Sequence, residues 1–451
     1  MSGRVEATRR TTLPVDVRTL EAYHESPVAF ERLAPPWHDV QLVERTGGLE
    51  PGARTRFRGR AGPIRFIWDA EHVEHAGPGF TDVMRRGPLA QWRHEHLFEP
   101  RPDGTVLTDR IEAKIRGPYV PASITARVAR DVDAMLRYRH EVTRDDLADP
   151  HPGRALRIAI TGSSGLIGTR LRLRLLARGH RVVRLVRSAP VSPDAVRWNP
   201  SGPWDASPLD GFDAVVHLAG ENLGARLRWT RDARERILRS RVQGTGSVAS
   251  ALSRLERPPA LVSASAVGVY GDGGEALLDE RAPAGGGFLA GVCVAWEGAT
   301  EPARAAGIRV VHPRFGIVLA ARSGAIRPLI LLASLGLLGA IGTGRQRMPW
   351  ISLHDCARAL EHLVTSTLDG PVNLAVPETP TQRELFEVLA RLKGRRLFMS
   401  APASLVTTAL GAQGRELLLF GQRVAHSRLT DDGFAWTHPS VESALAADLG
   451  L

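Results

Sequence analysis

The stretch that most constrains the fold of this chain is glycine-rich and runs from Ile158 to Gly168. The apolar segment Leu156–Ile160 at its start predicts a buried strand, and the segment Thr169–Arg178 after it predicts a helix. Between the two, glycines recur at intervals of three: Gly162, Gly165 and Gly168. A strand, a glycine turn and a helix in this order are typical of a site that binds phosphate groups.

Each glycine of this turn has a separate physical role. The first permits the tight turn, the second lets the backbone approach a pyrophosphate, and the third lets the helix pack against the strand. The N-terminus of the helix then faces the anion. We therefore expect a nucleotide cofactor here, with an ordinary strand-to-helix turn as the alternative. The expected cofactor residues are Gly162, Ser163, Ser164, Gly165, Leu166, Ile167 and Gly168.

The composition limits the classes of protein to which the chain can belong. A length of 451 residues predicts two or three domains. The net charge of +11 comes from arginines that are spread along the chain, since the only lysines are Lys114 and Lys393. Because no run of five or six like charges occurs, we expect no nucleic-acid partner. Two cysteines, Cys293 and Cys356, do not make a disulfide framework.

The sequence shows no targeting signal or membrane span. The first residues lack the apolar core of a signal peptide. The longest apolar run, Leu329–Ile341, is too short to cross a membrane and predicts a buried helix. We therefore expect a cytoplasmic protein.

Residues 1–148 are expected to form a domain of the α+β class. A strand at Val5–Leu13 and two short helices precede several strand-like runs between about 39 and 115, which glycine and proline separate. A long helix follows at Pro121–Val142, with apolar residues on one face. This order predicts a helix-grip arrangement, in which a curved sheet wraps one helix and encloses an apolar pocket.

Strand alternation in the segment Trp92–Phe98 places His94 and His96 on one face of the sheet. That face is either the wall of a pocket for a planar ligand or, as we favour, a partly buried face with two hydrogen-bonded histidines. No third ligand stands at a recognisable spacing, so we expect no metal.

The order of these elements, together with the segments Leu33–Trp37 and Trp92–Phe98, resembles the START-like (SRPBCC) superfamily of polyketide cyclases/dehydrases and lipid-transport proteins. The resemblance covers the first third of the chain. It implies a ligand-binding domain that holds a small-molecule substrate.

The segment Thr143–Gly153 is charged and then rich in proline and glycine, which predicts a domain boundary. From residue 155 to about 390, strand and helix patterns alternate. This alternation predicts an α/β Rossmann fold with a doubly wound parallel sheet. The expected strands are 156–160, 181–186, 213–218, 260–264, 308–311 and 371–375.

The end of the second expected strand indicates which dinucleotide binds. NAD needs an acidic residue there for the ribose hydroxyls, but the strand ends at Arg187 and the nearest carboxylate is Asp194. An arginine suits the 2′-phosphate of NADP, so we favour NADP, while NAD stays open if an acid comes from elsewhere. Other residues expected beside the cofactor are Leu218, Ala219, Gly220, Glu221, Pro313 and Arg314.

Several motifs after residue 156 resemble the atypical extended short-chain dehydrogenases/reductases known as epimerase family, or sugar nucleotide epimerase-like, proteins. The motifs are the glycine turn and the segments His217–Asn222, Arg228–Thr230, Ser263–Gly271, Phe288–Glu297, Pro313–Leu319, Trp350–Asp355, Gly421–Val424 and Asp432–Phe434. The resemblance implies the extended Rossmann fold and a small C-terminal module, here residues 391–451.

Short-chain dehydrogenases use a Tyr-x-x-x-Lys pair, in which the lysine lowers the pKa of the tyrosine and the tyrosine transfers the proton. That pair is absent here. Tyr270 is the only tyrosine after residue 150, and Gly274 stands four residues later. Lys393 is the only lysine of the second domain and lies far from the expected helix.

Four residues remain as candidates for the chemistry. Ser265, or Ser263 in its place, matches the serine of the usual catalytic set. Cys293 or Glu297 would transfer protons if burial raised the carboxyl pKa; the alternatives are a small buried thiol and a helix carboxylate paired with an arginine. Tyr270 is either catalytic or a packed residue beside the cofactor.

These observations predict an NADP-dependent oxidoreductase or epimerase-like enzyme that lacks the Tyr-x-x-x-Lys pair. Its substrate would be a small apolar or anionic molecule held by the N-terminal domain. The alternative is a non-catalytic protein whose ligand capture responds to NADP.

Overall fold

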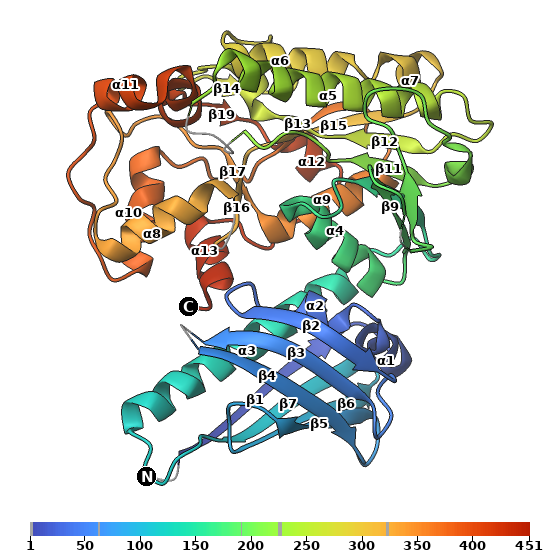
Figure 1. The fold of residues 1–451 in the computed structure, drawn as a ribbon, viewed down its shortest axis with the longest axis vertical. Coiled ribbons are helices and arrows are strands. Elements are labelled where there is room, and N and C mark those ends of the chain that lie inside the picture. The colour runs from blue at the N-terminus through green and yellow to red at the C-terminus, as the bar shows by residue number, and fades with distance from the viewer. Residues whose placement is uncertain (1–2, 62–63, 191, 224–227, 322–323) are drawn as a thin grey trace. The chain divides into compact units, whose positions relative to one another are not determined.

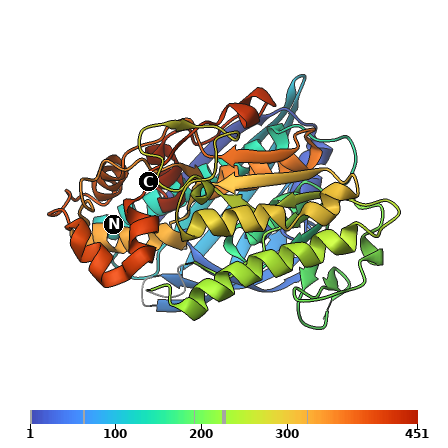
Figure 2. The same cartoon turned by 90° about the horizontal axis from the view of Figure 1, so that it is seen from above.

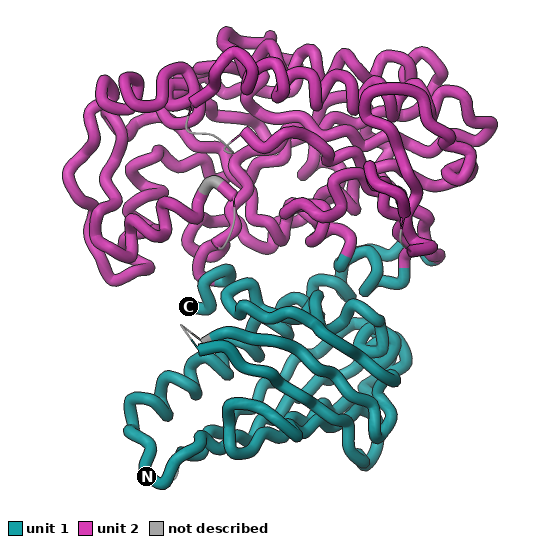
Figure 3. The backbone as a smooth tube through the Cα atoms, viewed as in Figure 1, with its two compact units in different colours: residues 1–153, 173–179, 447–451 teal, residues 154–172, 180–446 magenta. Residues whose placement is uncertain are grey.

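The computed structural model of the chain describes residues 3–61, 64–190, 192–223, 228–321 and 324–451. These residues form two compact units, which Figure 3 shows in different colours. The first unit consists of residues 1–153, 173–179 and 447–451, and the second of residues 154–172 and 180–446. The module predicted at 391–451 is therefore part of the second unit up to residue 446.

The first unit is built on a seven-stranded antiparallel sheet (Figure 1). The strand order is β1-β7-β6-β5-β4-β3-β2, so consecutive hairpins are extended by β1 beside β7. The glycine and proline spacing predicts such hairpins. The strands are β1 (Arg4–Leu13), β2 (Asp39–Thr46), β3 (Arg54–Ala61), β4 (Ile64–Val73), β5 (Gly79–Arg86), β6 (Gln91–Arg101) and β7 (Gly104–Lys114).

Three helices accompany this sheet: α1 (Val17–Glu25), α2 (Ala29–Leu33) and α3 (Ala122–Ala148). The side chain of Asp16 caps α1 by accepting a hydrogen bond from Thr19 N at 2.8 Å. α3 packs Val132 and Leu136 against Ile111 of the sheet. The antiparallel sheet and the long helix are confirmed, while the helix-grip class of this unit stays a prediction.

The long helix ends at Ala148 and not at the predicted Val142. The reason is that the charged residues after Val142 are not a solvated linker. Asp146 is fully buried and accepts hydrogen bonds from Arg32 Nε at 2.7 Å and from the Tyr23 hydroxyl at 2.8 Å. A buried ion pair therefore continues the helix where composition alone predicts a boundary.

The second unit contains an eight-stranded sheet in which all pairs are parallel. Its order is β10-β9-β8-β11-β12-β15-β13, with β18 also beside β15, which confirms the predicted doubly wound sheet. The strand predicted at 308–311 lies at 310–315. The strands are β8 (Arg157–Thr161), β9 (Arg181–Val186), β10 (Ala195–Arg197), β11 (Ala214–His217), β12 (Ala260–Ser263), β13 (Ser265–Ala266), β15 (Val310–Phe315) and β18 (Gly370–Leu374).

Two short parallel pairs lie outside this sheet: β14 (Leu277–Leu278) with β19 (Arg423–Val424), and β16 (Ile317–Leu319) with β17 (Trp350–Ser352). The helices from the glycine turn onward are α4 (Leu166–Ala177), α5 (Arg231–Leu252), α6 (Phe288–Gly298), α7 (Glu301–Ala305), α8 (Arg327–Leu335), α9 (Leu353–Thr365), α10 (Gln382–Leu392), α11 (Ala403–Gly414), α12 (Ser427–Asp431) and α13 (Val441–Leu449).

Helices cover both faces of the parallel sheet. α5 and α6 run side by side over one face, and α4 and α9 lie on the other (Figures 1 and 2). Because both faces are covered, the middle of the sheet is apolar, and Val215, Leu261 and Val310 of three neighbouring strands are fully buried.

The apolar run Leu329–Ile341 is not one buried helix, contrary to the prediction. α8 ends at Leu335 because Gly336 turns the chain with φ +71°. Leu331 and Leu335 are each 61% exposed. No described helix is both long and apolar enough to cross a membrane.

A buried carboxylate on α9 holds the C-terminal segment in the second unit. Asp355 pairs with Arg358 at 2.8 Å and is fully buried. It also accepts hydrogen bonds from the backbone nitrogens of Thr437, at 3.0 Å, and His438, at 2.9 Å. The loop before α13 therefore depends on a charge that lies about eighty residues earlier in the chain.

A second carboxylate, that of Glu416 in the C-terminal segment, caps the N-terminus of α6. It accepts hydrogen bonds from Phe288 N at 2.9 Å and Leu289 N at 2.8 Å, while the cap residue Gly287 has no side chain to offer. We expect Glu416→Ala to lower the free energy of unfolding by about 1–2 kcal/mol, because the helix loses a cap and a favourable charge. Urea unfolding followed by tryptophan fluorescence measures this loss.

Glu442→Ala is the matched control. Glu442 forms an exposed ion pair with Arg391 at 2.8 Å, and exposed pairs contribute only about 0–1 kcal/mol. Equal losses of stability in the two variants would contradict the capping role of Glu416.

Candidate active site

The glycine turn lies between β8 and α4, as predicted. Gly162 has φ +66°, a conformation that side chains other than glycine rarely adopt. A Cβ atom on Gly162 would also lie 2.9 Å from the carbonyl carbon of Leu218 and 3.0 Å from Ala219 N. The structure therefore brings the turn against the predicted segment Leu218–Gly220, which follows the neighbouring strand β11.

The third glycine is required by close packing. A Cβ atom on Gly168 would lie 2.3 Å from the carbonyl oxygen of Gly162 and 2.9 Å from Ser163 Cα. Gly165 N donates to the same oxygen at 2.9 Å. Because Gly168 fits inside the first turn of the helix, α4 begins at Leu166 and not at the predicted Thr169. Ser164 and Gly165 are exposed at the turn, where a ligand can reach them.

Two residues that the sequence analysis missed join the ends of β8 and β11. Thr161 Oγ1 lies 2.8 Å from His217 Nδ1 and accepts hydrogen bonds from Leu218 N and Ala219 N, at 3.1 and 3.2 Å. Burial lowers the pKa of His217 to about 4, so the ring is neutral at neutral pH. The position of Thr161 directly before the first glycine was the available signal.

Arg187 is exposed and follows the last residue of β9, the strand beside β8. The acidic residue nearest in sequence is engaged elsewhere. Asp194 pairs with Arg184 at 2.8 Å, and hydrogen bonds from Arg184 and Ser192 lower the pKa of Asp194 to about 2. At the strand end that faces a ribose in this fold, the chain thus presents a cation.

Three of the four catalytic candidates, Ser265, Glu297 and Tyr270, meet in one buried polar network at the ends of parallel strands. Ser265, Arg314 and Asn373 are register neighbours on β13, β15 and β18. Ser265 Oγ donates to Glu297 Oε1 at 2.6 Å. Arg314 grips the same carboxylate with two bonds, of 2.8 and 2.9 Å. Arg314 also donates to the hydroxyl of Tyr270 at 2.9 Å, and that hydroxyl donates to Asn373 Oδ1 at 2.8 Å.

The structure does not meet the condition under which Glu297 was expected to act as an acid. Burial raises the pKa of this carboxyl, but the hydrogen bonds from Arg314 and Ser265 outweigh it, so the pKa lies below its ordinary value. Glu297 is therefore ionised and paired with an arginine, which was the alternative interpretation.

The other two candidates, Cys293 and Tyr270, are protonated at neutral pH. Cys293 is 3% exposed, and burial raises the pKa of its thiol to about 11. Burial likewise raises the pKa of Tyr270, whose hydroxyl is used by its two neighbours in the network. Both residues fit the packing roles named as alternatives.

Other predicted cofactor residues, Pro313, Arg314 and Glu221, lie in or after strands and contact other parts of the second unit. Pro313 and Arg314 are buried in β15, and the charge of Arg314 is used by Glu297. Glu221 follows β11 and holds its backbone to α5, because its nitrogen donates to Ser240 Oγ at 3.0 Å and its carbonyl accepts from Arg241 at 3.1 Å.

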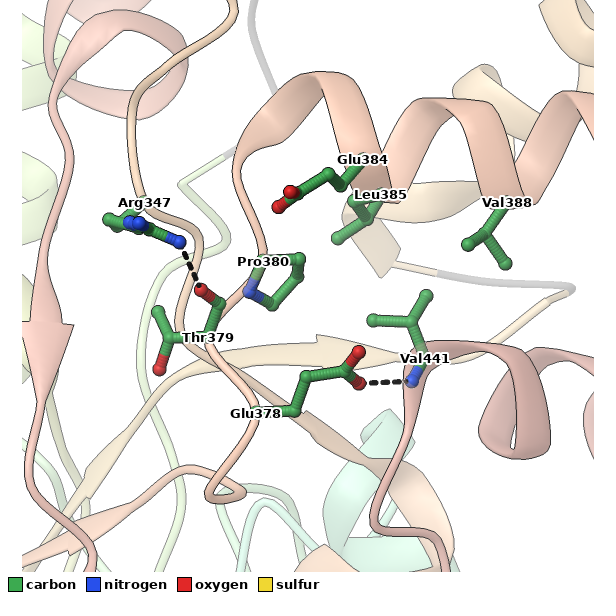
Figure 4. A pocket seen from close by; sticks show the side chains of 8 residues that line it. All are labelled: Arg347, Glu378, Thr379, Pro380, Glu384, Leu385, Val388 and Val441. Carbon is green, nitrogen blue, oxygen red and sulfur yellow. Dashed lines mark hydrogen bonds between the residues drawn. The ribbon is translucent and has the colours of Figure 1, made fainter.

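A pocket of about 310 Å³ lies elsewhere in the second unit (Figure 4). On one side Arg347 donates to the carbonyl of Thr379 at 3.2 Å, and on another Glu378 accepts from Val441 N at 2.8 Å. None of the predicted cofactor or catalytic residues lines it; the lining residues are Arg347, Glu378, Thr379, Pro380, Glu384, Leu385, Val388 and Val441.

Known sequences match this chain from the glycine turn to near its end. A sequence profile of the NAD dependent epimerase/dehydratase family matches residues 158–375, and one of a domain of unknown function (DUF1731) matches residues 401–447. An epimerase family protein of Mycobacterium tuberculosis is 41% identical over 290 residues, which cover 96% of that protein and 64% of this chain. Human epimerase family protein SDR39U1 is 35% identical over 296 residues, with 98% and 64% covered.

Solved structures give the same result. The nucleoside-diphosphate sugar epimerase of Corynebacterium glutamicum is 30% identical with a TM-score of 0.80, and the match covers 98% of this chain and 90% of that one. Human SDR39U1, solved with NADPH, is 32% identical with a TM-score of 0.60, covering 65% of this chain and 99% of that one. Because it covers relatives of more than 30% identity almost from end to end, this chain belongs to the epimerase family.

Proposed function

We propose that the second unit binds NADPH at the turn between β8 and α4, and that the chain is an NADP-dependent oxidoreductase or epimerase-like enzyme. The observation that carries this proposal is the glycine turn with Arg187 at the end of the adjacent strand. Human SDR39U1, a relative of the same family, has been solved with NADPH.

The turn has the features that a dinucleotide phosphate requires. The exposed backbone around Ser164 and Gly165 lies at the N-terminus of α4, whose dipole favours an anion. Arg187 adds a guanidinium that can take the 2′-phosphate in a bidentate contact. Since Asp194 is paired with Arg184, no carboxylate from this strand end competes for that position.

The chain's own residues would hold the substrate oxygen and its proton near Ser265. When bound, NADP⁺ would take up the hydride of a substrate alcohol, and the proton of that alcohol would pass through Ser265 to the carboxylate of Glu297. The hydroxyl of Ser265 donates to Glu297, so Ser265 Oγ keeps its lone pairs for a substrate hydroxyl. The ion pair with Arg314 keeps the carboxylate of Glu297 ionised. This arrangement would replace the missing tyrosine–lysine pair.

The first unit would hold a small apolar ligand, as the START-like resemblance implies. Half-buried aromatic rings on β3, β4 and β6 of one sheet support this assignment. Phe57 stacks on Trp68 with ring centroids 5.7 Å apart, and Trp92 meets Trp68 edge-on at 5.2 Å. Such rings offer a planar ligand a wide apolar surface.

Calorimetric titration with NADPH and NADH tests the proposal on two variants. We expect Arg187→Ala to weaken NADPH binding by roughly 10- to 100-fold, because a hydrogen bond to a charged group is worth about 1.5–3 kcal/mol. NADH binding should stay unchanged, since NADH lacks the 2′-phosphate.

Arg181→Ala provides the control, because Arg181 is an exposed arginine at the other end of the same strand. It should bind both nucleotides like the wild type. A chain that binds neither nucleotide, or an Arg187→Ala variant that loses both equally, would refute the proposal.

A second candidate function is a non-catalytic protein whose ligand capture responds to NADP. The raised pKa of Cys293, the occupied hydroxyl of Tyr270 and the paired carboxylate of Glu297 favour it, because they leave no free acid or base. Absorbance of NADPH during incubation with carbonyl substrates separates the two functions. Consumption of NADPH supports the enzyme, and binding without consumption against a broad substrate panel supports the alternative.

A further inference from the structure

The antiparallel sheet of the first unit gathers histidines and carboxylates from neighbouring strands. His94 and His96 of β6 lie on the buried face, as the alternation predicts, and are 1% and 2% exposed. Asp82 of β5 is the register partner of His94. Sequence spacing shows no third ligand for the two histidines, but the pairing of β5 with β6 supplies one.

The distances fit a shared central ion better than hydrogen bonds. Asp82 Oδ2 lies 3.6 Å from His94 Nδ1 and 3.7 Å from His96 Nε2. Hydrogen bonds of this type are about 2.7–3.2 Å long. Ligand atoms that bind one tetrahedral zinc ion at about 2.0–2.2 Å lie about 3.3–3.6 Å from each other. The three ligand atoms all lie within 4.8 Å of one another.

Each imidazole turns one ring nitrogen toward Asp82 and the other toward Asp109 of β7. On the side of Asp82 both distances exceed hydrogen-bond length, whereas on the other side His96 Nδ1 lies 2.7 Å from Asp109 Oδ1. The favoured interpretation of the sequence, hydrogen-bonded histidines, therefore fits the contact of His96 with Asp109 but not the side of the two rings that faces Asp82.

A second carboxylate stands behind the histidines, where metal sites place one. Asp109 of β7 is 2% exposed and lies 2.7 Å from His96 Nδ1 and 3.6 Å from His94 Nε2, the ring nitrogens that point away from Asp82. Carboxylates at this position orient metal-bound imidazoles and make them more basic.

From this geometry we propose that Asp82, His94 and His96 form a binding site for one divalent transition metal ion such as Zn²⁺ or Fe²⁺. Two imidazoles and one carboxylate suit these ions, whereas Mg²⁺ and Ca²⁺ prefer oxygen ligands alone. Three protein ligands leave a position open, as in catalytic and not structural sites. His72, the register partner of Asp82 on β4, has a buried Nδ1 without a hydrogen-bond partner among the described residues.

Metal titration of the full-length chain tests the site. Protein freed of metal with a chelator is titrated with Co²⁺, followed by its visible absorption, and the Co²⁺ is then displaced with Zn²⁺ under calorimetry. We expect one ion per chain and a rise in the thermal unfolding temperature on binding. Asp82→Asn should weaken the affinity at least about tenfold, and His94→Gln should weaken it further.

Asp133→Asn is the control, because Asp133 is an exposed carboxylate on α3 of the same unit. It should bind the ion like the wild type. Asp82→Asn keeps the size of a side chain that is 17% exposed. The circular dichroism of this variant should therefore match that of the wild type, even if His94→Gln fails to fold. The proposal is overturned if the wild type binds no stoichiometric ion, or if Asp82→Asn binds as tightly and with the same absorption spectrum.

Discussion

Replacing Glu297 with glutamine is expected to lower the free energy of unfolding by about 3–5 kcal/mol. The side chain keeps its size, but the guanidinium of Arg314, which is 7% exposed, loses the carboxylate that grips it with two hydrogen bonds. An unpaired charge away from water costs far more than the pair contributes. Urea unfolding at neutral pH, followed by tryptophan fluorescence, measures the loss.

Two further variants show that the loss comes from the unpaired charge. Replacing both partners with apolar residues of similar size, as in the double variant Glu297→Leu with Arg314→Met, should restore much of the stability. Glu275→Gln breaks the exposed pair of Glu275 with Arg347 and should change stability by less than about 1 kcal/mol. A loss below about 1 kcal/mol in Glu297→Gln would contradict the network.

The same pair makes stability depend on pH in a definite direction. The pKa of Glu297 is lower in the folded chain than its ordinary value of 4.5. The stabilisation is therefore fully present above pH 4.5 and is lost as the pH falls through the lower pKa of the folded state. In Glu297→Gln this part of the acid dependence should be missing.

The second large effect is expected at the glycine turn. Gly168→Ala should weaken NADPH binding by about 100-fold and cost about 1–3 kcal/mol of stability. The new methyl group would lie 2.3 Å from the carbonyl oxygen of Gly162, which is backbone and cannot rotate away. The turn must shift, and the amides that meet the phosphates shift with it.

Gly291→Ala is the matched control for this substitution. Gly291 lies inside α6, and a Cβ atom there would meet nothing within 4 Å. Alanine favours a helix over glycine by about 1 kcal/mol, so this variant should be at least as stable as the wild type and bind NADPH equally. Unchanged binding by Gly168→Ala would exclude the turn as the phosphate site.

The positions of the main strands along the chain and the glycine turn could be predicted because both depend on local sequence. Apolar runs, glycine spacing and the arginine after β9 are visible without tertiary structure. Element ends were less accurate, since α3 continues to Ala148 through charges that Arg32 and Tyr23 bury, and α4 starts at Leu166 because Gly168 fits its first turn.

The state of the catalytic candidates could not be predicted, because it depends on partners that are distant in sequence. Glu297 on α6 meets Arg314 on β15 only after the strands have assembled, and that contact lowers the pKa of the carboxyl although burial raises it. In the same way, Asp82 reaches the two histidines only through the register of β5 with β6. The sequence named both possible roles of each catalytic candidate, and tertiary contacts decided between them.

The hydrogen bonds that the C-terminal segment forms with α6 and α9 have a consequence for folding during synthesis. α6 is synthesised long before Glu416, which lies 128 residues after Phe288. Asp355 is likewise synthesised 82 residues before Thr437, whose amide donates to it. Domains usually fold as units during synthesis, but this unit lacks the hydrogen bonds of Glu416 and Thr437 until these residues have emerged from the ribosome. The nascent second unit therefore cannot complete its fold until these late residues have been added.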